Sequence, residues 1–559
     1  MKNWRIYLVF VFLIIFGAGI IIYLFDLQII KHKFYQAQAL GQQTVFEEVE
    51  GNRGRVFFKN AEKSLAVNND NRILYANPQL IDNKEETALI LSEIIKIPSS
   101  QILAKIEKEN SSYSTIKSKL EEEEINKIEN LGLEGIYLEL FPGRYYPQEK
   151  IAAPVIGFLG GDQVGQYGLE GYYDEILKGE KSFKEEPRTL VLFNPQKFEP
   201  FSLDGSDLYL TVDYNIQFEV ESLLKEAKEK FDIDSGQIIV MDPKTGQVVA
   251  MADFPSFDPN QYSKEKDLDI FQNDATQKIF EPGSVLKPIT MAIALNEGKI
   301  TPDTTYIDEG FVKVGISTIY NFDKTKKYGT QTMTQILENS LNTGAIFVSR
   351  LINPDVYLEY IDKFGLNEKT GIDLQGEVYS RNENLRKGQE INFATASFGQ
   401  GIEMTPIQLT RAFCVIANGG KLIKPYIVDK IVSSQKEETE TKPKIINEVI
   451  SQQTASQLTT MLISAVNNGF AKKAGVAGYY VAGKTGTAQV AFEDKKGYYP
   501  DKTIHSFVGF APALNPRFVV LVKLNNPKGK SSGETAAPIF SELAQYIFNY
   551  WQIPPDYEQ

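Results

Sequence analysis

The sequence FEPGSVLKPITMAIAL, residues 280–295, organises the interpretation of the whole chain. Its Glu-Pro-Gly opening predicts a turn, and the apolar run over 289–295 predicts a buried helix. Ser284 would then lie near the helix N-terminus, where unpaired backbone N–H groups favour developing negative charge. Lys287 follows about one turn later on the same face, and a desolvated lysine can activate a serine hydroxyl. The stretch therefore predicts a Ser-Lys acyl-transfer enzyme.

The Ser-x-x-Lys spacing alone is not specific, because it occurs five times in the chain. The other four copies begin at Ser114, Ser222, Ser263 and Ser433. They lie in polar, Lys/Glu-rich stretches or on a plain amphipathic helix, where a solvated surface pair is the ordinary interpretation. Only Ser284 combines a turn, a helix start and an apolar helix behind it.

Length and composition narrow the classes of function. A chain of 559 residues is too long for one hydrophobic core, so we expect two or three domains. The net charge of 59 − 72 = −13 argues against nucleic-acid binding, which needs a basic surface. The single cysteine, Cys414, excludes an internal disulfide and a cysteine-cluster metal site, and we expect it to be an inert core residue. Two histidines are too few for most zinc sites, and only His505 keeps a Ser-His-Asp triad formally open.

The N-terminus predicts a membrane anchor. Residues 6–25 carry no charge and are long enough to span a bilayer core of about 30 Å. No small-residue cleavage site follows, which favours an uncleaved anchor over a signal peptide. Lys2 and Arg5 place residues 1–5 in the cytoplasm by the positive-inside rule, although the basic residues 31–33 are a counter-signal. Residues 26–41 are expected to continue as an amphipathic stalk.

The rest of the chain predicts an α+β protein. Residues 84–132 are strongly charged and predicted to be helical. The hydrophobic pattern of the sequence changes near residue 201, where a second domain is expected to begin. The C-terminal part predicts an antiparallel sheet with helices packed on it. Its predicted elements are a strand at 207–213, a helix at 215–230, hairpins at 237–241/247–251 and 506–511/518–524, and a helix at 537–550. The tail from residue 552 is expected to fray.

Two further elements complete the predicted chemistry. Ser340-Leu341-Asn342 lies 340 − 284 = 56 residues after the serine, and supplies a hydroxyl for proton relay and an orienting carboxamide. Lys484-Thr485-Gly486-Thr487 lies within an alternating strand pattern, with a cation and hydroxyls that could face a cleft. The Ser-x-Asn pattern also occurs at Ser380, and Lys-Thr-Gly also occurs at Lys244 and Lys369, all in predicted turns or charged loops.

Ser-x-x-Lys, Ser-x-Asn and Lys-Thr-Gly in this order resemble the motif set of the penicillin-binding proteins. More of the chain resembles class B of that family, the peptidoglycan transpeptidases. The further matching stretches are 242–246, 280–284, 394–401, 482–489 and 505–512, of which the last two look most like the division-specific branch. In the N-terminal half, Arg53-Gly54, residues 144–147 and Gly168-Leu169-Glu170 resemble the family's pedestal motifs. The chain departs from the family at 58–61, where Phe-Lys-Asn-Ala replaces the usual Asp-Arg-Asn-Gly turn.

The resemblance implies a penicillin-binding transpeptidase fold, with a central antiparallel sheet flanked by helices. An elongated N-terminal pedestal and one transmembrane helix are expected beside it. The expected divisions are a cytoplasmic tail at 1–5, a transmembrane helix at 6–25, a pedestal at 26–200, a transpeptidase domain at 201–551 and a tail at 552–559.

The family's chemistry can be carried over residue by residue. The resemblance implies that Ser284 attacks the penultimate D-Ala of a stem peptide while Lys287 takes its proton. Ser340 would pass a proton to the departing D-Ala, and Asn342 would orient Lys287 and the substrate. The backbone N–H groups of Ser284 and Thr487 would form the oxyanion hole. Lys484, Thr485, Gly486 and Thr487 would bind the terminal carboxylate, and no metal or organic cofactor is implied.

Other classes share part of this pattern. A class A β-lactamase would show a Glu-x-x-Leu-Asn loop, and none lies between Asn342 and Lys484. A D,D-carboxypeptidase and an elongation-type transpeptidase stay open, and a non-catalytic cell-wall scaffold would not need all three motifs. The expected partners are peptidoglycan stem peptides, β-lactam antibiotics, the membrane, a polytopic glycan polymerase and other division proteins. No nucleic acid is expected.

Overall fold

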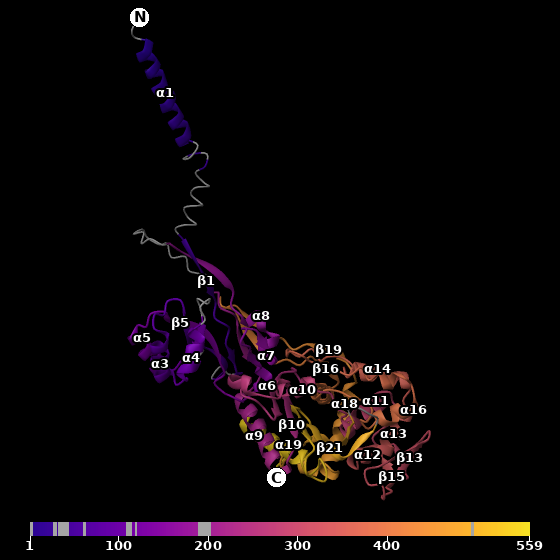
Figure 1. Cartoon of the computed structure of the whole chain (residues 1–559). Helices are drawn as coiled ribbons and strands as arrows, with labels where there is room; N and C mark the ends of the chain where they lie inside the picture. Colours follow the sequence, from indigo (N-terminus) through magenta and orange to yellow (C-terminus); the bar gives the residue numbers. More distant parts are fainter. Residues whose placement is uncertain are drawn as a thin grey trace. The chain divides into compact units, whose positions relative to one another are not determined.

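The computed structural model describes residues 4–25, 29, 31, 44–59, 63–107, 114–117, 120–187, 203–492 and 497–558. The chain forms two compact units, Met1–Asn52 with Lys178–Gly205, and Arg53–Leu177 with Ser206–Gln559. The first unit holds helix α1 (Trp4–Phe25) and an antiparallel ribbon of β1 (Thr44–Glu50) and β8 (Lys181–Pro187) (Figure 1).

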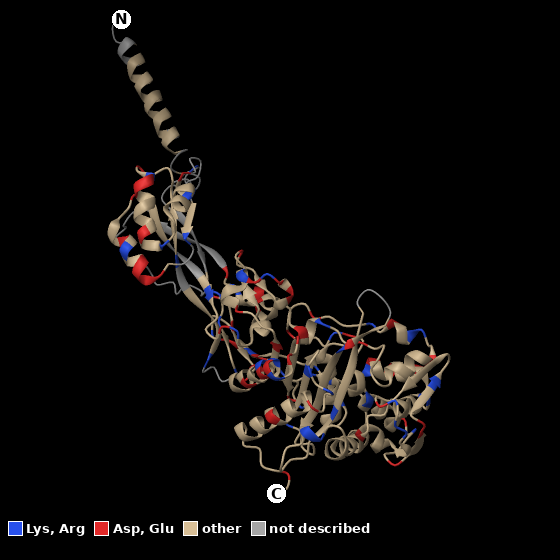
Figure 2. Ribbon diagram, turned by 60° about the horizontal axis from the view of Figure 1, so that its bottom comes forward, with Lys and Arg blue, Asp and Glu red and all other residues tan. Residues whose placement is uncertain are grey.

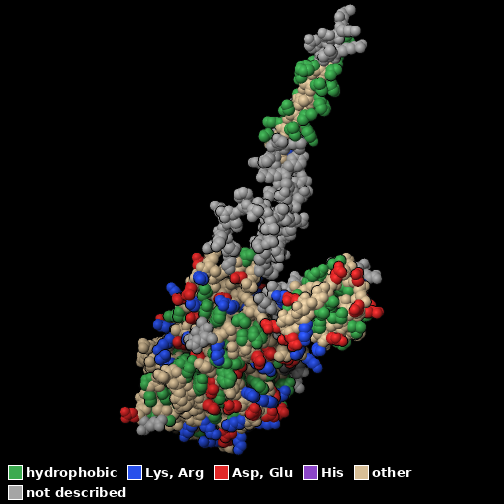
Figure 3. All heavy atoms as spheres, turned by 90° about the vertical axis from the view of Figure 1, so that its left-hand side faces the viewer, with side chains coloured by type: hydrophobic (Ala, Val, Ile, Leu, Met, Phe, Trp, Pro, Cys, Tyr) green, Lys and Arg blue, Asp and Glu red, His purple; other side chains and the backbone are tan. Residues whose placement is uncertain are grey.

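Helix α1 is long and apolar enough over Leu8–Phe25 to cross a membrane, by length and composition. Figure 3 shows its hydrophobic side chains exposed along the helix. The stalk predicted over 26–41 lies outside the described residues, apart from positions 29 and 31.

In the second unit, one mixed sheet contains strands from both halves of the chain. Its order is β18-β17-β9-β2-β3-β4, and β5 also pairs with β3. These strands are β2 (Val56–Phe57), β3 (Ser64–Ala76), β4 (Ser114–Lys117), β5 (Ile136–Tyr145), β9 (Asp207–Leu210), β17 (Val428–Val432) and β18 (Glu438–Glu440). Strand β2 pairs with β9 in parallel, Val56 opposite Leu208. Segments before and after residue 201 therefore share backbone hydrogen bonds.

Three helices pack on one end of this sheet: α3 (Lys84–Ile95), α4 (Ser99–Ile106) and α5 (Glu122–Leu131). Figure 2 colours the acidic residues of α3 and α5 red along the ribbon. A capping box between Glu121 and Glu124 begins α5, as the acidic run predicts. The prediction of helix throughout 84–132 is wrong at 114–117. These residues form β4, because Ile116 is buried in the small core between the helices and the sheet.

The C-terminal part is built on a five-stranded antiparallel sheet of order β11-β10-β22-β21-β20. Its strands are β10 (Ser235–Met241), β11 (Val248–Phe254), β20 (Ala482–Ala491), β21 (Tyr498–Ala511) and β22 (Phe518–Asn525). Both predicted hairpins and the α+β class are thereby confirmed.

Both faces of this sheet are buried. Residues of even number in β10, such as Ile238 and Val240, share a core with helices α9 (Tyr214–Phe231) and α19 (Ala536–Tyr550). Residues of odd number, such as Ile239, share a second core with α11 (Lys287–Asn296), α17 (Pro406–Ala417) and α18 (Gln452–Asn468). Because strand side chains alternate between faces, one apolar strand serves two helical layers. Cys414 on α17 is buried in this second core, as predicted.

Shorter elements complete the unit. The helices are α6 (Ala153–Ile156), α7 (Gly168–Tyr172), α8 (Asp174–Leu177), α10 (Asp274–Gln277), α12 (Met333–Glu338), α13 (Asn342–Arg350), α14 (Pro354–Lys363), α15 (Glu383–Arg386) and α16 (Glu390–Ala396), with 3-10 turns η2 (Pro259–Lys264), η3 (Leu268–Phe271), η4 (Gly283–Leu286) and η5 (Lys472–Ala474). The strands are β6 (Phe158–Leu159), β7 (Gly165–Gln166), β12 (Thr305–Asp308), β13 (Phe311–Val314), β14 (Ser317–Tyr320), β15 (Gly329–Thr332), β16 (Lys421–Ile423) and β19 (Ile445–Glu448).

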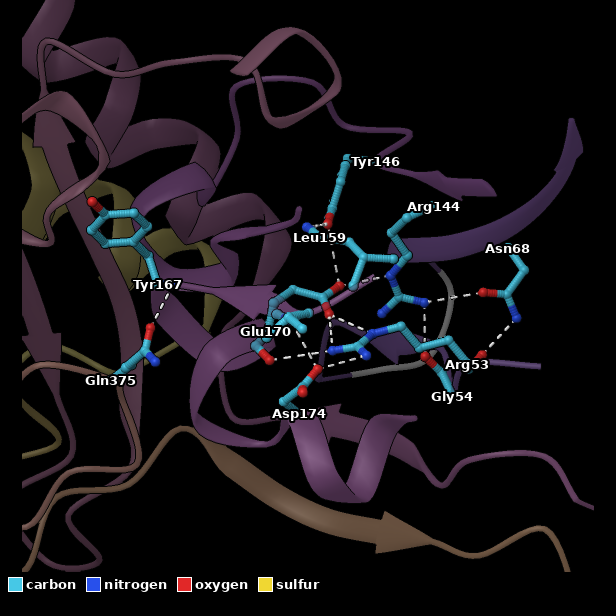
Figure 4. Close-up of polar contacts among 12 residues, drawn as sticks. Arg53, Gly54, Asn68, Arg144, Tyr146, Leu159, Tyr167, Glu170, Asp174 and Gln375 are labelled. Atoms are coloured by element: carbon cyan, nitrogen blue, oxygen red, sulfur yellow. Dashed lines mark hydrogen bonds and ion pairs between the residues drawn. The ribbon is translucent and has the colours of Figure 1, made fainter. Parts of the chain in front are cut away.

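A buried ionic cluster brings together the three N-terminal motifs (Figure 4). Glu170 has no exposed surface and pairs with Arg53 at 2.7 Å and with Arg144 at 2.6 Å. Arg53 also pairs with Asp174 at 2.8 Å, and the Tyr146 hydroxyl donates to Glu170 at 3.3 Å. Burial by itself would raise the pKa of Glu170, but the charges of Arg144 and Arg53 lower it overall.

The C-terminal tail does not fray, contrary to the prediction. Ile553 is buried against the α19 side of the sheet, and its carbonyl accepts a 2.6 Å hydrogen bond from the Tyr479 hydroxyl. The Tyr480 amide donates to the Asp556 carboxylate at 2.8 Å. One apolar side chain and a few hydrogen bonds thus hold the tail on the segment that leads into β20.

Candidate active site

The predicted nucleophile lies on a short 3-10 turn that runs directly into the buried helix. Turn η4 carries Ser284, and α11 begins at Lys287 with all its residues to Leu295 buried. The Gly283 amide donates to the Gly399 carbonyl at 2.9 Å. Gly399 has φ +82°, and a Cβ there would lie 2.0 Å from the Gly283 oxygen. Only glycine therefore fits at position 399, where the backbone passes close to the turn that carries Ser284.

Lys287 connects the serine turn to the Ser340 segment. Its Nζ lies 2.9 Å from Ser284 Oγ, 2.6 Å from the Ser340 carbonyl oxygen and 3.2 Å from Ser340 Oγ. The side chain is fully buried. Burial, and then the charge of Lys484, lower the pKa of Lys287 well below its usual value.

The Ser-x-Asn motif bridges two helices. Ser340 lies between α12 and α13 in a left-handed conformation, φ +51°, and Asn342 begins α13. The side-chain Nδ2 of Asn342 donates to the Tyr320 carbonyl at 3.0 Å. In this structure the Ser340 carbonyl, rather than the Asn342 carboxamide, accepts from the Lys287 amine.

Lys484 approaches the same hydroxyl from strand β20. Its Nζ lies 3.0 Å from Ser340 Oγ and donates to the Thr485 carbonyl at 3.0 Å. Lys484 is 1% exposed, and burial lowers its pKa to about 7. Gly486 lies on the same strand, where a Cβ would lie 2.9 Å from a Val285 methyl. The glycine thus lets β20 run close beside the serine turn.

The serine turn, the Ser340 segment and strand β20 border one cleft of about 690 Å³, beneath whose surface Lys287 and Lys484 are buried. Five of the predicted site residues contribute to its walls: Ser284, Ser340, Asn342, Thr485 and Thr487. The lining includes four aromatic residues, Tyr320, Phe322, Phe398 and Phe470. It also includes two exposed lysines, Lys324 and Lys530. No aspartate or glutamate is among the described lining residues, although the chain as a whole is acidic. The cleft therefore suits an extended, anionic ligand.

Comparison with known proteins agrees with this geometry. Residues 236–545 match the penicillin-binding protein transpeptidase domain, and residues 48–188 match the penicillin-binding protein dimerisation domain. The chain is 34% identical over 510 residues to stage V sporulation protein D of Bacillus subtilis, covering 88% of this chain and 77% of the relative. The chain belongs to the class B penicillin-binding proteins.

Other matches to this penicillin-binding protein cover more than nine-tenths of the chain. A peptidoglycan D,D-transpeptidase FtsI homolog of Mesostigma viride is 30% identical, covering 95% of this chain and 93% of the relative. The crystal structure of penicillin-binding protein 3 of Mycobacterium tuberculosis in complex with aztreonam is 27% identical, with a TM-score of 0.71. That match covers 91% of this chain and 98% of the crystallised chain.

The repeated short motifs of this penicillin-binding protein lie away from the cleft. Ser114 and Lys117 lie on β4, Ser222 and Lys225 on α9, Ser263 on η2, and Ser433 and Lys436 at the turn between β17 and β18. Lys244 lies in the turn between β10 and β11, and Lys369 precedes a loop in which Thr370 bonds to Glu377. Ser380 lines a separate polar cavity with Glu403.

His505 does not form a triad with Ser284. It lies on β21 with 1% exposure, and its ring nitrogens contact the hydroxyls of Thr535 and Thr503. Burial lowers the pKa of His505 to about 4, so the ring is neutral at physiological pH.

Sequence reasoning missed the segment Lys530-Ser531-Ser532-Gly533, which lines the cleft just before α19. The Ser532 hydroxyl lies 3.1 Å from Thr487 Oγ1. The only sequence signal is a short Lys/Ser/Gly-rich loop, which is typical of any connection between a strand and a helix.

Proposed function

We propose that this penicillin-binding protein crosslinks peptidoglycan stem peptides as a D,D-transpeptidase, with Ser284 as nucleophile and Lys287 as its base. The observation that carries the proposal is the set of three contacts at the Lys287 amine. A neutral amine has two N–H donors and one lone pair. The donors match the Ser340 carbonyl and hydroxyl, and the lone pair then faces the Ser284 hydroxyl proton.

Acylation follows from this arrangement. Ser284 Oγ attacks the carbonyl carbon of the penultimate D-Ala while its proton moves to Lys287. The backbone N–H groups of Ser284 and Thr487 bind the resulting oxyanion, an interaction worth about 3–4 kcal/mol per donor in a comparable hydrolase. The C–N bond then breaks, and the leaving D-Ala nitrogen receives the proton through Ser340, whose hydroxyl lies between the amines of Lys287 and Lys484.

Binding and deacylation use the other side of the cleft. Lys484, Thr485 and Thr487 hold the terminal carboxylate, with Gly486 allowing the close approach of β20, and Asn342 orients the stem peptide. The amine of a second stem peptide then attacks the acyl-enzyme carbonyl. Ser284 leaves with a proton, and a new amide joins the two peptides. A β-lactam that mimics the D-Ala-D-Ala end would acylate Ser284 in the same way.

The test is covalent labelling of the full-length protein in detergent with a fluorescent penicillin. We expect wild type to be labelled for hours and Ser284→Ala to be unlabelled. Ser433→Ala, which removes the serine of a Ser-x-x-Lys copy at a surface turn, is the matched control and should be labelled like wild type. Labelling of folded Ser284→Ala would refute the assignment of the nucleophile.

Product analysis with paired stem peptides identifies the acceptor. A crosslinked dimer is expected. Release of D-Ala without a dimer, in the presence of an acceptor amine, would show a carboxypeptidase. Rapid loss of the penicillin label would show a β-lactam hydrolase instead.

We further propose a setting in septal wall synthesis, supported by the relatives with sporulation and FtsI names. Residues 1–5 would be cytoplasmic and 6–25 would span the membrane, with the pedestal (26–200), the transpeptidase domain (201–551) and the tail (552–559) outside. The membrane helix would pair with a polytopic glycan polymerase. Exchanging residues 6–25 for an unrelated span should abolish co-purification with such a polymerase but leave penicillin labelling unchanged.

A further inference from the structure

The subsite for the terminal carboxylate contains a hydroxyl pair that extends beyond strand β20. Thr487 Oγ1 lies 3.1 Å from Ser532 Oγ and accepts from the Ser532 amide at 3.4 Å. Ser532 is 2% exposed, yet both residues line the cleft. A hydroxyl has one proton and two lone pairs. If both lone pairs of Thr487 are occupied by Ser532, the Thr487 proton is free to point into the cleft.

The Ser532 segment is itself held by a buried chain of hydrogen bonds. Thr535 Oγ1 donates to the Ser531 carbonyl at 3.3 Å and lies 2.9 Å from His505 Nδ1. His505 Nε2 lies 3.3 Å from the Thr503 hydroxyl. One direction satisfies every member: Thr503 O–H donates to Nε2, Nδ1–H donates to Thr535, and Thr535 O–H donates to Ser531. This direction requires a neutral ring with the proton on Nδ1.

Two observations indicate that this series of hydrogen bonds positions the cleft residue Ser532 and does not cap helix α19. Thr535 is the N-cap residue of α19, where a threonine ordinarily accepts from the first turn of its helix. Its side chain makes no such bond here and is used by His505 and Ser531 instead. His505 also lies directly opposite Thr487 in the β20–β21 pairing. Thr487 is therefore next to both ends of the network, since it contacts Ser532 through its hydroxyl and is paired with His505 across the sheet.

We propose that Ser532 is a positioning residue of the carboxylate subsite, which directs the Thr487 proton toward the substrate's terminal carboxylate, and that His505 and Thr535 hold Ser532 in place. This inference rests on the proposed transpeptidase function. It gives His505, the single histidine among the described residues, a structural role in the substrate site.

The experiment compares two donors that differ only in charge at that end. The probes are a D-alanyl thioester with a free terminal carboxylate and its methyl ester, tested with full-length protein in detergent. Ser532→Ala keeps the backbone N–H and removes the hydroxyl. We expect kcat/KM for the carboxylate donor to fall about tenfold, as for loss of one oriented hydrogen bond to a charged group, with less than a twofold change for the ester.

A second pair of variants tests the supporting chain. Thr535→Val removes the hydroxyl and should show the same loss, selective for the carboxylate donor. Thr535→Ser restores the hydroxyl and should recover wild-type selectivity. Ser541→Ala is the control: it removes a half-buried hydroxyl on α19 that donates to the Gly475 carbonyl outside the cleft lining, and should change neither rate.

The outcomes separate this inference from the proposed function. Equal slowing with both donors, or no change with either, would overturn the role of Ser532 while wild type is still acylated. Equal kcat/KM values for Thr535→Val and Thr535→Ser with the carboxylate donor would overturn the role of the Thr535 hydroxyl. Failure of wild type itself to be acylated by either thioester or by penicillin would refute the proposed function, and the inference with it.

Discussion

Lys287 and Lys484 contact the same oxygen atom. Their Nζ atoms lie 3.2 and 3.0 Å from Ser340 Oγ, and both side chains are buried. Two ammonium groups around one hydroxyl would repel each other in a poorly solvated site. Burial lowers the pKa of Lys484 to about 7. Burial, and then the charge of Lys484, lower the pKa of Lys287 well below its usual value. A positive charge on one lysine therefore favours the neutral form of the other, which agrees with the proposed roles of Lys287 as base and Lys484 as the cation that binds the carboxylate.

This arrangement predicts a bell-shaped pH dependence of acylation. The rate rises with pH as Lys287 loses its proton and becomes a base. It falls above about pH 7 as Lys484 loses the positive charge that attracts the substrate carboxylate. The measurement is kcat/KM for a carboxylate-ended thioester between pH 5 and 10. Its methyl ester should lose the decline at high pH, and a decline equally steep for both donors would contradict this role of Lys484.

Gly399→Ala should slow acylation without unfolding the protein. The new Cβ would lie 2.0 Å from the Gly283 oxygen and would displace the turn that carries Ser284. A misplacement of about 1 Å can cost about 10²-fold in rate, which a penicillin-labelling time course would detect. Gly388→Ala is the matched control. It has a similar positive φ of +69° but nothing within 4 Å of the added carbon, so it should label at the wild-type rate.

Glu170→Gln should destabilise the unit that contains the pedestal motifs. It leaves Arg53 and Arg144, with side-chain exposures of 9% and 3%, without their shared carboxylate. Breaking a buried pair in this way costs about 3–5 kcal/mol, measurable as a lower midpoint of chemical denaturation. Glu129→Gln removes an exposed partner of Arg72 and should leave the midpoint unchanged. Equal midpoints for both variants would mean that the buried cluster contributes no net stability.

Ile553→Ala tests whether the docked tail contributes to stability. The side chain is 8% exposed, and truncation of a buried isoleucine costs about 2–5 kcal/mol. Leu514→Ala, at a site 69% exposed, should have little effect on the same denaturation curve. A tail that detaches freely in solution would instead give two indistinguishable variants.

Much of the architecture was predictable because its signals are local. The apolar periods of α9, α11 and α19 and the turn residues between β10 and β11 predicted those elements close to their observed bounds. The errors occurred where a distant partner decides the outcome. Residues 114–117 form a strand because β3 offers them an edge, and the tail is ordered because the segment before β20 receives Ile553.

The sequence by itself determined the order of the motifs, the two hairpins and the buried helix behind Ser284, because turn chemistry and hydrophobic period act over a few residues. Only the tertiary structure decided which of five Ser-x-x-Lys pairs and three Lys-Thr-Gly copies meet at one hydroxyl. It also decided that the Ser340 carbonyl accepts from Lys287 and that Ser532 contacts Thr487. Such contacts join segments 45 to 144 residues apart, as for Thr487–Ser532 and Ser340–Lys484, and depend on how whole layers pack.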